Sequence, residues 1–455
     1  MVKKYVSILL GICLIGTMAG CGNEGESEST DEKTVISFYS WSENAEQDFD
    51  KAIIAQFEKE NPDIDVEEVF VPYSEYLSKM NTMAAAESLP DVFKLPEGNV
   101  LEWGEKGALL DVKPLFEEAG VDLENFMVNS AIFQVDENVW GVGCNVATIA
   151  LYYNKDLFEQ AGIEVPSSDA DNPWTWEELV NAARKLIKDA NGNTSEDPDF
   201  DSDNIAVYGT MMPTDWNVFI PLLYTNGAGI ANEEGTELLI NTPEGIEVIQ
   251  SIADLSQVYQ CAPSVAMAEG AFADKTTMLM NGQVAMLIDG SWSLGTYANE
   301  GFDVGVAQIP MFSQPANMSW TAGICMAPEN AENEAAFEFY QYYTDFSNAL
   351  STSLNENVAL GGLPHTLNVF DDGENEADWI ATYTEVDETA NCEMFKDILN
   401  QEGTRLGENV TLKNFPSIVD STIMSALDNV WLGNQTAEEA LSSINVDSDL
   451  QGVWN

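Results

Sequence analysis

Several short segments of the sequence place a tryptophan or an acid directly after an apolar run that is typical of a buried strand. In AMLIDGSWSL, residues 285–294, Asp289, Gly290 and Trp292 follow a strand predicted over 284–288. An indole ring offers a flat apolar face, and the carboxylate beside it accepts hydrogen bonds from hydroxyls. A sugar ring has an apolar face of C–H groups and a rim of hydroxyls, so these residue types together suit a sugar.

The same residue types recur at other predicted strand ends and near residues 145 and 320. Ligands of open α/β sheets bind beyond the carboxyl ends of strands, where such side chains gather. For each residue, a plain core or surface role is the alternative. The candidate ligand-binding residues are Trp41, Ser42, Glu43, Glu97, Asn99, Asn145, Asp215, Trp216, Asn217, Asp289, Trp292 and Trp320.

Two other kinds of function use the same residue types. A glycosidase needs two carboxylates placed across the scissile bond, one of them with a raised pKa. Glu43, Glu97, Asp215 and Asp289 show no such pairing, so we expect no enzyme and no catalytic residue. Acids and tryptophans also surround polyamines and other cations, which they bind through ion pairs and cation–π contacts. A cationic ligand therefore remains an open alternative.

The charge of the chain excludes several classes of partner. It has 17 lysines and arginines against 77 aspartates and glutamates, a formal net charge of −60. Such a chain repels phosphate backbones, so nucleic acid is not expected as a partner. Arginine, the usual clamp for carboxylate and phosphate ligands, occurs only at Arg184 and Arg405. We therefore expect a neutral ligand.

No cofactor or metal is expected. His365 is the only histidine, and no cysteine–histidine cluster suggests zinc. The alternating acids between Asp197 and Asp203 predict a solvated loop, with a calcium site as the alternative. We favour free buried thiols over disulfides for the four widely spaced body cysteines, which are Cys144, Cys261, Cys325 and Cys392.

The N-terminus carries an export signal. Lys3 and Lys4 precede an apolar run over 5–18, and Ala19, Gly20 and Cys21 follow it. The run is short for a membrane span, and the segment resembles a bacterial lipobox, which implies cleavage before Cys21 and lipid on that cysteine. An ordinary secretory signal is the alternative. Residues 1–20 are thus a predicted signal peptide, and residues 21–34 are a lipidated cysteine with a polar tether.

The remaining chain alternates strand and helix signals, which predicts an α/β fold with a largely parallel sheet. Strands are expected over 35–41, 63–71 and 89–93, with helices between them. Phe49, Ile53 and Phe57 repeat at helical spacing and predict the core face of the first helix. Two further strands and a helix start are expected over 139–160. Capping boxes at Thr175–Glu178 and Thr436–Glu439 predict two helix starts.

Several motifs resemble those of one family, the extracellular solute-binding proteins of sugar ABC importers, which includes maltodextrin-binding proteins. The resemblance is spread over most of the mature chain, although residues 189–204 and 370–412 match no pattern of the family. It rests on SLPDVFKL, ALYYNKDLFEQAGIEVP with TWEELVNAARKL, NGQVAMLIDGSW, TAGICMAPENAENEAAFEFYQYY and LGGLP.

The resemblance implies a two-lobed periplasmic-binding-protein-like fold with discontinuous lobes and a hinged interlobe cleft. The N-terminal lobe is expected over 35–145 plus 322–362, and the C-terminal lobe over 146–321 plus 363–455. The expected function is capture of a neutral mono- or oligosaccharide for delivery to ABC permease subunits in the membrane. We expect a monomer, lipid-anchored on the extracellular face of the cytoplasmic membrane.

Overall fold

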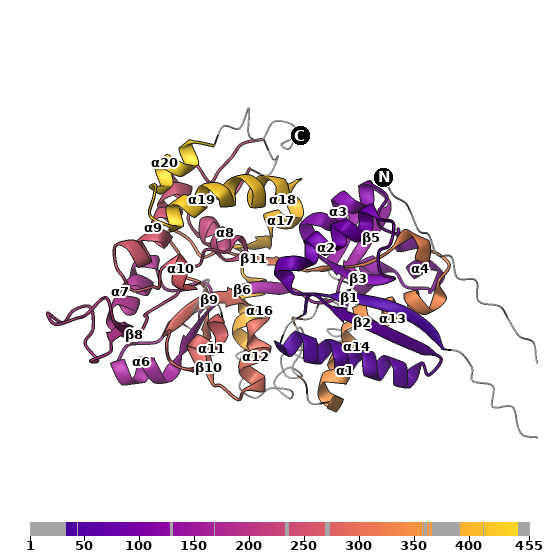
Figure 1. Cartoon of the computed structure of the whole chain (residues 1–455), viewed down its shortest axis with the longest axis horizontal. Coiled ribbons are helices and arrows are strands. Elements are labelled where there is room, and N and C mark those ends of the chain that lie inside the picture. The colour runs from indigo at the N-terminus through magenta and orange to yellow at the C-terminus, as the bar shows by residue number, and fades with distance from the viewer. Residues whose placement is uncertain are drawn as a thin grey trace, which may run out of the picture.

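Two mixed α/β lobes, each built on its own sheet, lie side by side in the structure (Figure 1). The computed structural model describes residues 33–42, 44–127, 131–167, 169–232, 236–268, 274–356, 358, 362–363, 365, 392–412 and 414–444. The predicted signal peptide, Cys21, most of the tether and Glu43 lie outside these residues. No helix within the described ranges is long and apolar enough to cross a bilayer.

The first lobe is built on a six-stranded sheet. Its strands are β1 (Thr34–Ser40), β2 (Ile64–Phe70), β3 (Val92–Leu95), β4 (Ile132–Val135), β5 (Asn138–Gly143) and β12 (Gly323–Met326). Their order is β2-β1-β3-β12-β5-β4. β1 is parallel to β2 and β3, whereas β12 is antiparallel to both β3 and β5.

Helices pack on this first sheet through apolar stripes. They are α1 (Asn44–Glu60), α2 (Tyr73–Ala85), α3 (Glu97–Glu105), α4 (Lys113–Glu118), α5 (Leu123–Phe126), α13 (Glu334–Thr344) and α14 (Phe346–Glu356), with a 3₁₀ turn at Pro328–Asn330. In α1, the residues at helical spacing, Phe49, Ile53 and Phe57, are buried. Phe57 meets Phe339 of α13 edge to face at 5.2 Å, which confirms the predicted core face of this helix.

The second lobe has a smaller sheet, of β6 (Ala147–Asn154), β9 (Met286–Gly290), β10 (Val304–Ala307), β11 (Asn317–Trp320) and β13 (Thr404–Leu406). β6 pairs with β9, β10 and β11, so it is the central strand. All of its residues except Ala147 are buried, as expected of a strand covered on both faces.

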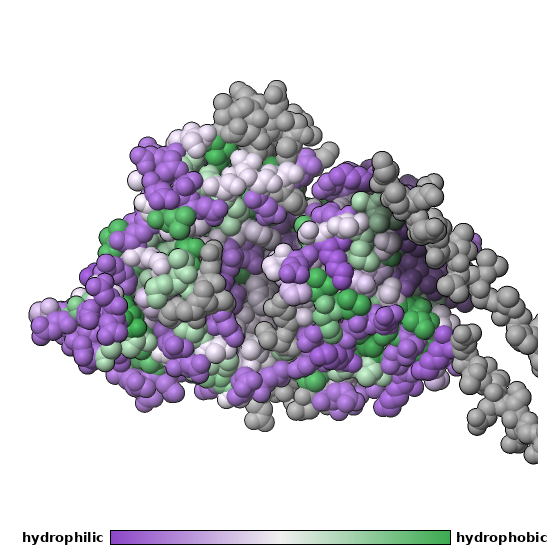
Figure 2. All heavy atoms as spheres, in the orientation of Figure 1, coloured by the Kyte–Doolittle hydropathy of each residue, from purple (hydrophilic) through white to green (hydrophobic). Residues whose placement is uncertain are grey.

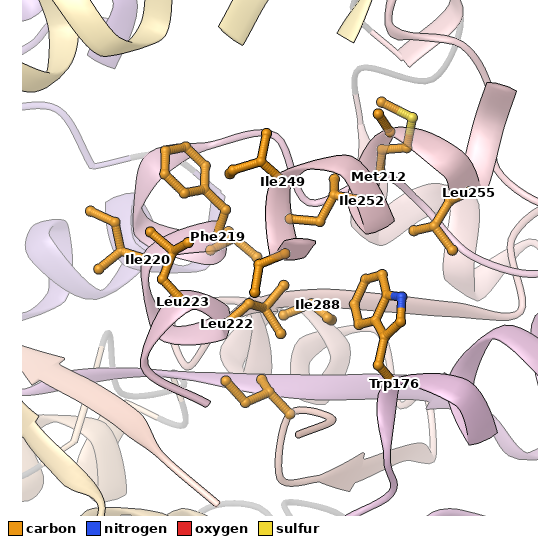
Figure 3. Packing of buried hydrophobic residues seen from close by; sticks show 14 of the residues in the cluster. Trp176, Met212, Phe219, Ile220, Leu222, Leu223, Ile249, Ile252, Leu255 and Ile288 are labelled. Carbon is orange, nitrogen blue, oxygen red and sulfur yellow. The ribbon is translucent and has the colours of Figure 1, made fainter. Parts of the chain in front are cut away.

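Most helices of the described residues belong to the second lobe. They are α6 (Lys155–Ala161), α7 (Trp176–Leu186), α8 (Trp216–Thr225), α9 (Pro243–Gln257), α10 (Val265–Ala268), α11 (Lys275–Met280), α12 (Ser293–Asn299), α16 (Cys392–Asn400), α17 (Glu408–Thr411), α18 (Phe415–Ile418), α19 (Met424–Trp431) and α20 (Ala437–Ser442), with a π-helical turn, η4, at Val419–Ile423. Their core joins Trp176 of α7 and Phe219 of α8 to Ile252 of α9 and Ile288 of β9 (Figure 3).

Both predicted capping boxes are present. The Thr175 hydroxyl accepts from the Glu178 backbone N–H while the Glu178 carboxylate accepts from that of Thr175. Thr436 and Glu439 form the same pair at the start of α20. Each box gives partners to N–H groups that have none inside the helix, so it determines where the helix begins.

The strands differ from their predicted bounds, by one residue at the ends of β1 and β2 and by more in β3 and β9. β3 begins at Val92 rather than at residue 89, because the Asp91 carboxylate accepts from the backbone N–H and the hydroxyl of Ser37, which holds Asp91 in the preceding loop. β9 covers 286–290 rather than 284–288, because β6 supplies pairing partners as far as Gly290.

Two antiparallel strand pairs carry the chain from one sheet to the other. β5 pairs with β12 in the first sheet, with Gly143 opposite Gly323. Their continuations β6 and β11 pair in the second sheet, with Ala147 opposite Trp320. Only residues 144–146 and 321–322 lie between. This sheet membership supports the lobe boundaries predicted near residues 145 and 321, which remain a proposal together with the one near 362.

The cysteines and the acidic loop show no covalent or metal cross-link within the described residues. Cys144, Cys261 and Cys325 are free thiols, and the side chain of Cys392 lies outside the described part. The hairpin of β7 (Lys188–Asp189) and β8 (Ile205–Val207) flanks the acidic loop. No group of three or more metal-ligating residues occurs in the described ranges.

Candidate ligand-binding site

A cavity of about 270 Å³ lies between the two lobes. The first lobe contributes residues from the starts of α2 and α3, and the second lobe contributes the starts of α8 and α18. Four aromatic residues line it: Tyr73, Tyr76, Trp216 and Phe415. The polar residues used below are Glu97, Asn99, Asn409 and Asp420. The space-filling view shows the hollow between the lobes, on a face that is mostly hydrophilic (Figure 2).

The junction after β9 explains the order acid, glycine, tryptophan. The Asp289 carboxylate accepts from the Gly290 N–H at 2.9 Å and from the Ser293 hydroxyl at 2.7 Å. A Cβ atom at residue 290 would collide with the ring of Trp292, so only glycine lets this indole fold back over the strand end. Asp289 therefore shapes the turn, and Trp292 remains partly exposed at the start of α12.

Three tryptophans of the second lobe form one aromatic cluster. Trp320 is buried, and its ring centroid lies 6.4 Å from that of Trp216 and 5.9 Å from that of Trp292. Phe415 meets Trp216 edge to face at 5.0 Å. Trp216 and Trp292 are both partly exposed. Trp320 therefore supports the two partly exposed rings from behind rather than offering its own face to a ligand.

One lysine joins the two acids that precede these tryptophans. The Lys275 ammonium lies 2.5 Å from an Asp215 carboxylate oxygen. Burial raises the pKa of Asp289, and Lys275 acts in the opposite direction. For Lys275 itself, burial acts to lower the pKa, but Asp215 and Asp289 outweigh it and raise the pKa. Both acids thus have a cationic neighbour within the second lobe.

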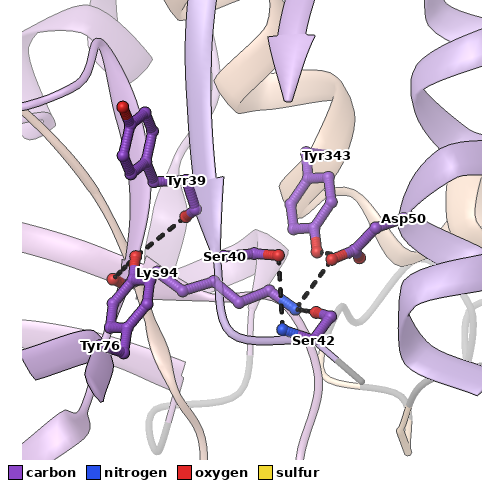
Figure 4. Close-up of polar contacts among 7 residues, drawn as sticks. All are labelled: Tyr39, Ser40, Ser42, Asp50, Tyr76, Lys94 and Tyr343. Atoms are coloured by element: carbon purple, nitrogen blue, oxygen red, sulfur yellow. Dashed lines mark hydrogen bonds and ion pairs between the residues drawn. The ribbon is translucent and has the colours of Figure 1, made fainter. Parts of the chain in front are cut away.

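The predicted residues at the end of β1 are divided between two environments. Trp41 packs edge to face on Tyr73 and Tyr76, at 5.7 and 5.0 Å, so it supports the wall of the cavity. Ser42 is 2% exposed, and its hydroxyl accepts from the Lys94 ammonium at 2.6 Å. Ser42 therefore belongs to a buried polar network (Figure 4). Glu43 lies outside the described residues.

Lys94 is the centre of that network. Its ammonium lies 3.4 Å from Asp50, whose carboxylate also accepts from the Tyr343 hydroxyl at 2.6 Å (Figure 4). Burial acts to lower the pKa of Lys94, but the Asp50 carboxylate outweighs it and raises the pKa. Asn145 lines a small cavity beside this network, so the structure places it near the crossing segments and away from the interlobe cavity.

Glu97 is the acid most closely tied to the cavity. It is 7% exposed, at the first position of α3, and its carboxylate accepts from the Asn409 side-chain amide. Burial raises the pKa of Glu97 to about 7. Asn99 is equally buried and lines the same cavity. Asn217, beside Trp216, has a buried side-chain oxygen without a hydrogen-bond partner among the described residues.

The cavity residues that the sequence did not point to include Tyr73, Tyr76, Phe415, Asn409 and Asp420. Tyr73 follows the end of β2, so the strand-end rule applied to the other candidates would have found it. Asn409 lies inside residues 370–412, which have no family-like motif, and Phe415 follows shortly after them, so no local signal points to either residue. His365 is fully buried: its Nε2–H donates to the Thr344 carbonyl at 2.8 Å, and its Nδ1 has no hydrogen-bond partner among the described residues.

The arrangement of two lobes around an aromatic and polar cavity is typical of a receptor for a small solute. The chain matches the family model described as bacterial extracellular solute-binding protein over residues 40–345. It belongs to this family, as the sequence motifs predicted.

Similar proteins agree with the fold. Maltodextrin-binding protein MdxE of Bacillus subtilis is 25% identical over 357 residues, 77% of this chain and 78% of that protein. The substrate-binding protein Lmo0181 of Listeria monocytogenes, solved in complex with cycloalternan, has a TM-score of 0.75 and 27% identity over 90% of this chain and 96% of that one. The maltotriose-bound MalE domain of Bdellovibrio bacteriovorus has a TM-score of 0.72 at 21% identity, covering 90% and 97% of the two chains. The predicted two-lobed fold is confirmed.

The packing of Trp292 on Gly290 can be tested by a double-mutant cycle. We expect Gly290→Ala to lower the free energy of unfolding by about 1–3 kcal/mol, because the new methyl group collides with the indole. In a Trp292→Ala background the same change should cost little, because the collision is gone. Urea unfolding of the wild-type protein, the two single variants and the double variant measures the cost of Gly290→Ala in each background. Equal costs in the two backgrounds would show that the ring does not require the glycine.

Proposed function

We propose that this chain captures a carbohydrate outside the cytoplasm and delivers it to an ABC importer. The observation that carries the proposal is Trp216, a partly exposed indole in an interlobe cavity whose other walls supply buried carboxyl and amide groups. The names of the relatives support it, since they include maltodextrin-, galactooligosaccharide- and multiple sugar-binding proteins.

The charges around the tryptophans favour a neutral sugar over a cation. Asp215 and Asp289, the acids that a polyamine would need beside Trp216 and Trp292, already have Lys275 as their cationic neighbour. A bound cation would have to compete with this ammonium. Glu97, with its pKa raised to about 7, is partly protonated near neutral pH and can then donate to a hydroxyl as well as accept.

We further propose that the sugar is bound without turnover. Glycoside hydrolysis needs one carboxyl group as acid and a second as nucleophile or base, both facing the substrate. Asp289 uses its carboxylate to hold Gly290 and Ser293, and Asp215 is paired with Lys275. These contacts leave neither acid free for such a role.

The mature protein is proposed to be a monomer, attached by lipid on Cys21 to the outer face of the cytoplasmic membrane. There it would dock on the permease subunits of the importer. The lipobox-like segment and the polar tether support the anchor, and the net charge of −60 argues against nucleic acid as a partner.

Loss of the Trp216 platform should weaken binding without unfolding the protein. After a thermal-shift screen identifies the best sugar, we expect Trp216→Ala to cost about 1–3 kcal/mol of binding, or ten- to a hundred-fold in affinity. Trp216→Phe should recover part of the loss. Calorimetry at low and high salt checks both expectations, since a neutral ligand should bind almost equally in each.

Trp174 provides the matched control. It is a partly exposed tryptophan of the same lobe, stacked on Phe158 and absent from the cavity lining. Trp174→Ala should leave affinity within a few-fold. Unchanged affinity in folded Trp216→Ala, or a strong salt dependence in the wild-type protein, would contradict a neutral sugar on this platform.

The lipid anchor is tested in cells that express the full chain. Cys21→Ala should accumulate as unprocessed precursor without fatty-acid label, because the acceptor sulfur and the processing site are lost together. Cys144→Ala, which removes a thiol of the folded body, should label normally. Full labelling of the Cys21 variant would exclude this cysteine as the anchor.

A further inference from the structure

The segment Gly407-Glu408-Asn409 connects the second lobe to the first. It lies outside the residues that match the family model, which ends at residue 345. The α17 helix that it opens packs against α3 of the first lobe. Val410 packs against apolar clusters of both lobes. This short helix is therefore a contact between lobes that the family match does not account for.

Glu408 fixes the segment to the second lobe. Its buried carboxylate accepts from the backbone N–H groups of Ile230 and Ala231 at 2.9–3.0 Å and from the Tyr224 hydroxyl at 3.1 Å. The Arg405 guanidinium lies 3.5 Å from the Tyr224 ring centroid. A carboxylate with several donors in a buried setting is held rigidly, so Glu408 sets the position of the next residue.

Asn409 reaches across the cleft from this fixed base. It is 1% exposed, and its side-chain amide donates to the Glu97 carboxylate. A Cβ atom at residue 407 would collide with the Asn409 side-chain oxygen, so Gly407 is needed for the side chain to lie in this way. Among the hydrogen bonds of the described residues, this one links α3 to the second lobe.

We propose that Asn409 is a positioning residue that latches the closed cleft by holding Glu97 from the opposite lobe. Glu97 also lines the cavity, so the latch and the ligand share one carboxyl group. Closing the lobes thereby orients Glu97 for the ligand. The latch itself does not depend on which ligand binds, and only the affinity measurements below rest on the proposed function.

The charge state of Glu97 makes the latch sensitive to pH. The titratable groups around Glu97 are Asp420 of η4 and Tyr73 of α2, while Glu408 points to residues 230 and 231. Burial raises the pKa of Glu97 to about 7 in the closed protein, above its ordinary value of 4.5. The closed form thus binds the proton more tightly, so closure is favoured below pH 4.5 and weakens as the pH rises through 7.

Replacing Asn409 with an aspartate tests the latch. Two spin labels, one on an exposed site of each lobe, report the interlobe distance in the ligand-free protein. At pH 8 we expect Asn409→Asp to open the cleft, because two carboxylates would then face each other, and to weaken sugar binding at least about tenfold. Lowering the pH to 5 should close it again, since one shared proton restores a donor.

Three further variants separate the latch from a general loss of structure. The pair Glu97→Gln with Asn409→Asp restores a donor and an acceptor in swapped positions, so it should be closed at both pH values. Ser417→Asp adds the same charge at an exposed position of α18 and should behave as wild type. Glu97→Gln alone should stay closed and lose the pH dependence that wild type shows.

The outcomes are distinct. A closed Asn409→Asp protein at pH 8, an open swapped pair, or an unchanged pH dependence in Glu97→Gln would each overturn the latch. A wild-type protein that binds no sugar in the screen would instead refute the proposed function. The interlobe distances, which are measured without ligand, would still test the latch.

Discussion

The pairing of the two crossing segments is the constraint on which the rest of the structure depends. β5 and β12 are hydrogen-bonded partners in one sheet, and their continuations β6 and β11 are partners in the other. The two crossings therefore run as one ribbon, in which a Cβ at Gly143 would collide with Thr321, and the Thr321 hydroxyl donates to the Asn145 carbonyl. Because the ribbon is short, the two sheets must lie with the ends of these strands facing each other across the cleft.

The tryptophan cluster follows from the central position of β6. Ile149 of β6 lies opposite Gly290 of β9 on one side, and Ala147 lies opposite Trp320 of β11 on the other. Gly290 and Trp320 thus lie on opposite sides of β6, and their partners on that strand are two residues apart. Trp292 is folded back over Gly290, so its ring must meet that of Trp320. Trp216 of α8 also packs against the buried Trp320 ring.

Two lysines neutralise buried carboxylates of this acidic chain, and one of them also pairs with an exposed aspartate. Lys94 forms an ion pair with Asp50 inside the first lobe. Beside the cleft, Lys275 forms an ion pair with Asp215, and its charge acts against the burial that raises the pKa of Asp289. Burying a carboxylate without a cation or several donors is costly. Burial raises the pKa of both Glu408 and Glu97; Glu408 has backbone and tyrosine donors and the nearby Arg405 to offset this, whereas Glu97 has few donors. Burial also raises the pKa of Asp289 and of Asp420, so Glu97 is one of several acids at the cleft whose charge depends on their surroundings.

The sequence by itself determined the features that depend on neighbours a few residues away. The capping boxes and the core face of α1 depend on residues three or four positions apart, so they were predicted correctly. The tryptophans at strand ends and the family motifs indicated the class of protein. Only the tertiary structure decided which side chains meet: Ser42 turns into the Lys94 network, Trp320 is buried behind two other rings, and Asn409 contacts Glu97 from 312 positions away. Such contacts depend on strand order and lobe packing, which no local spacing encodes.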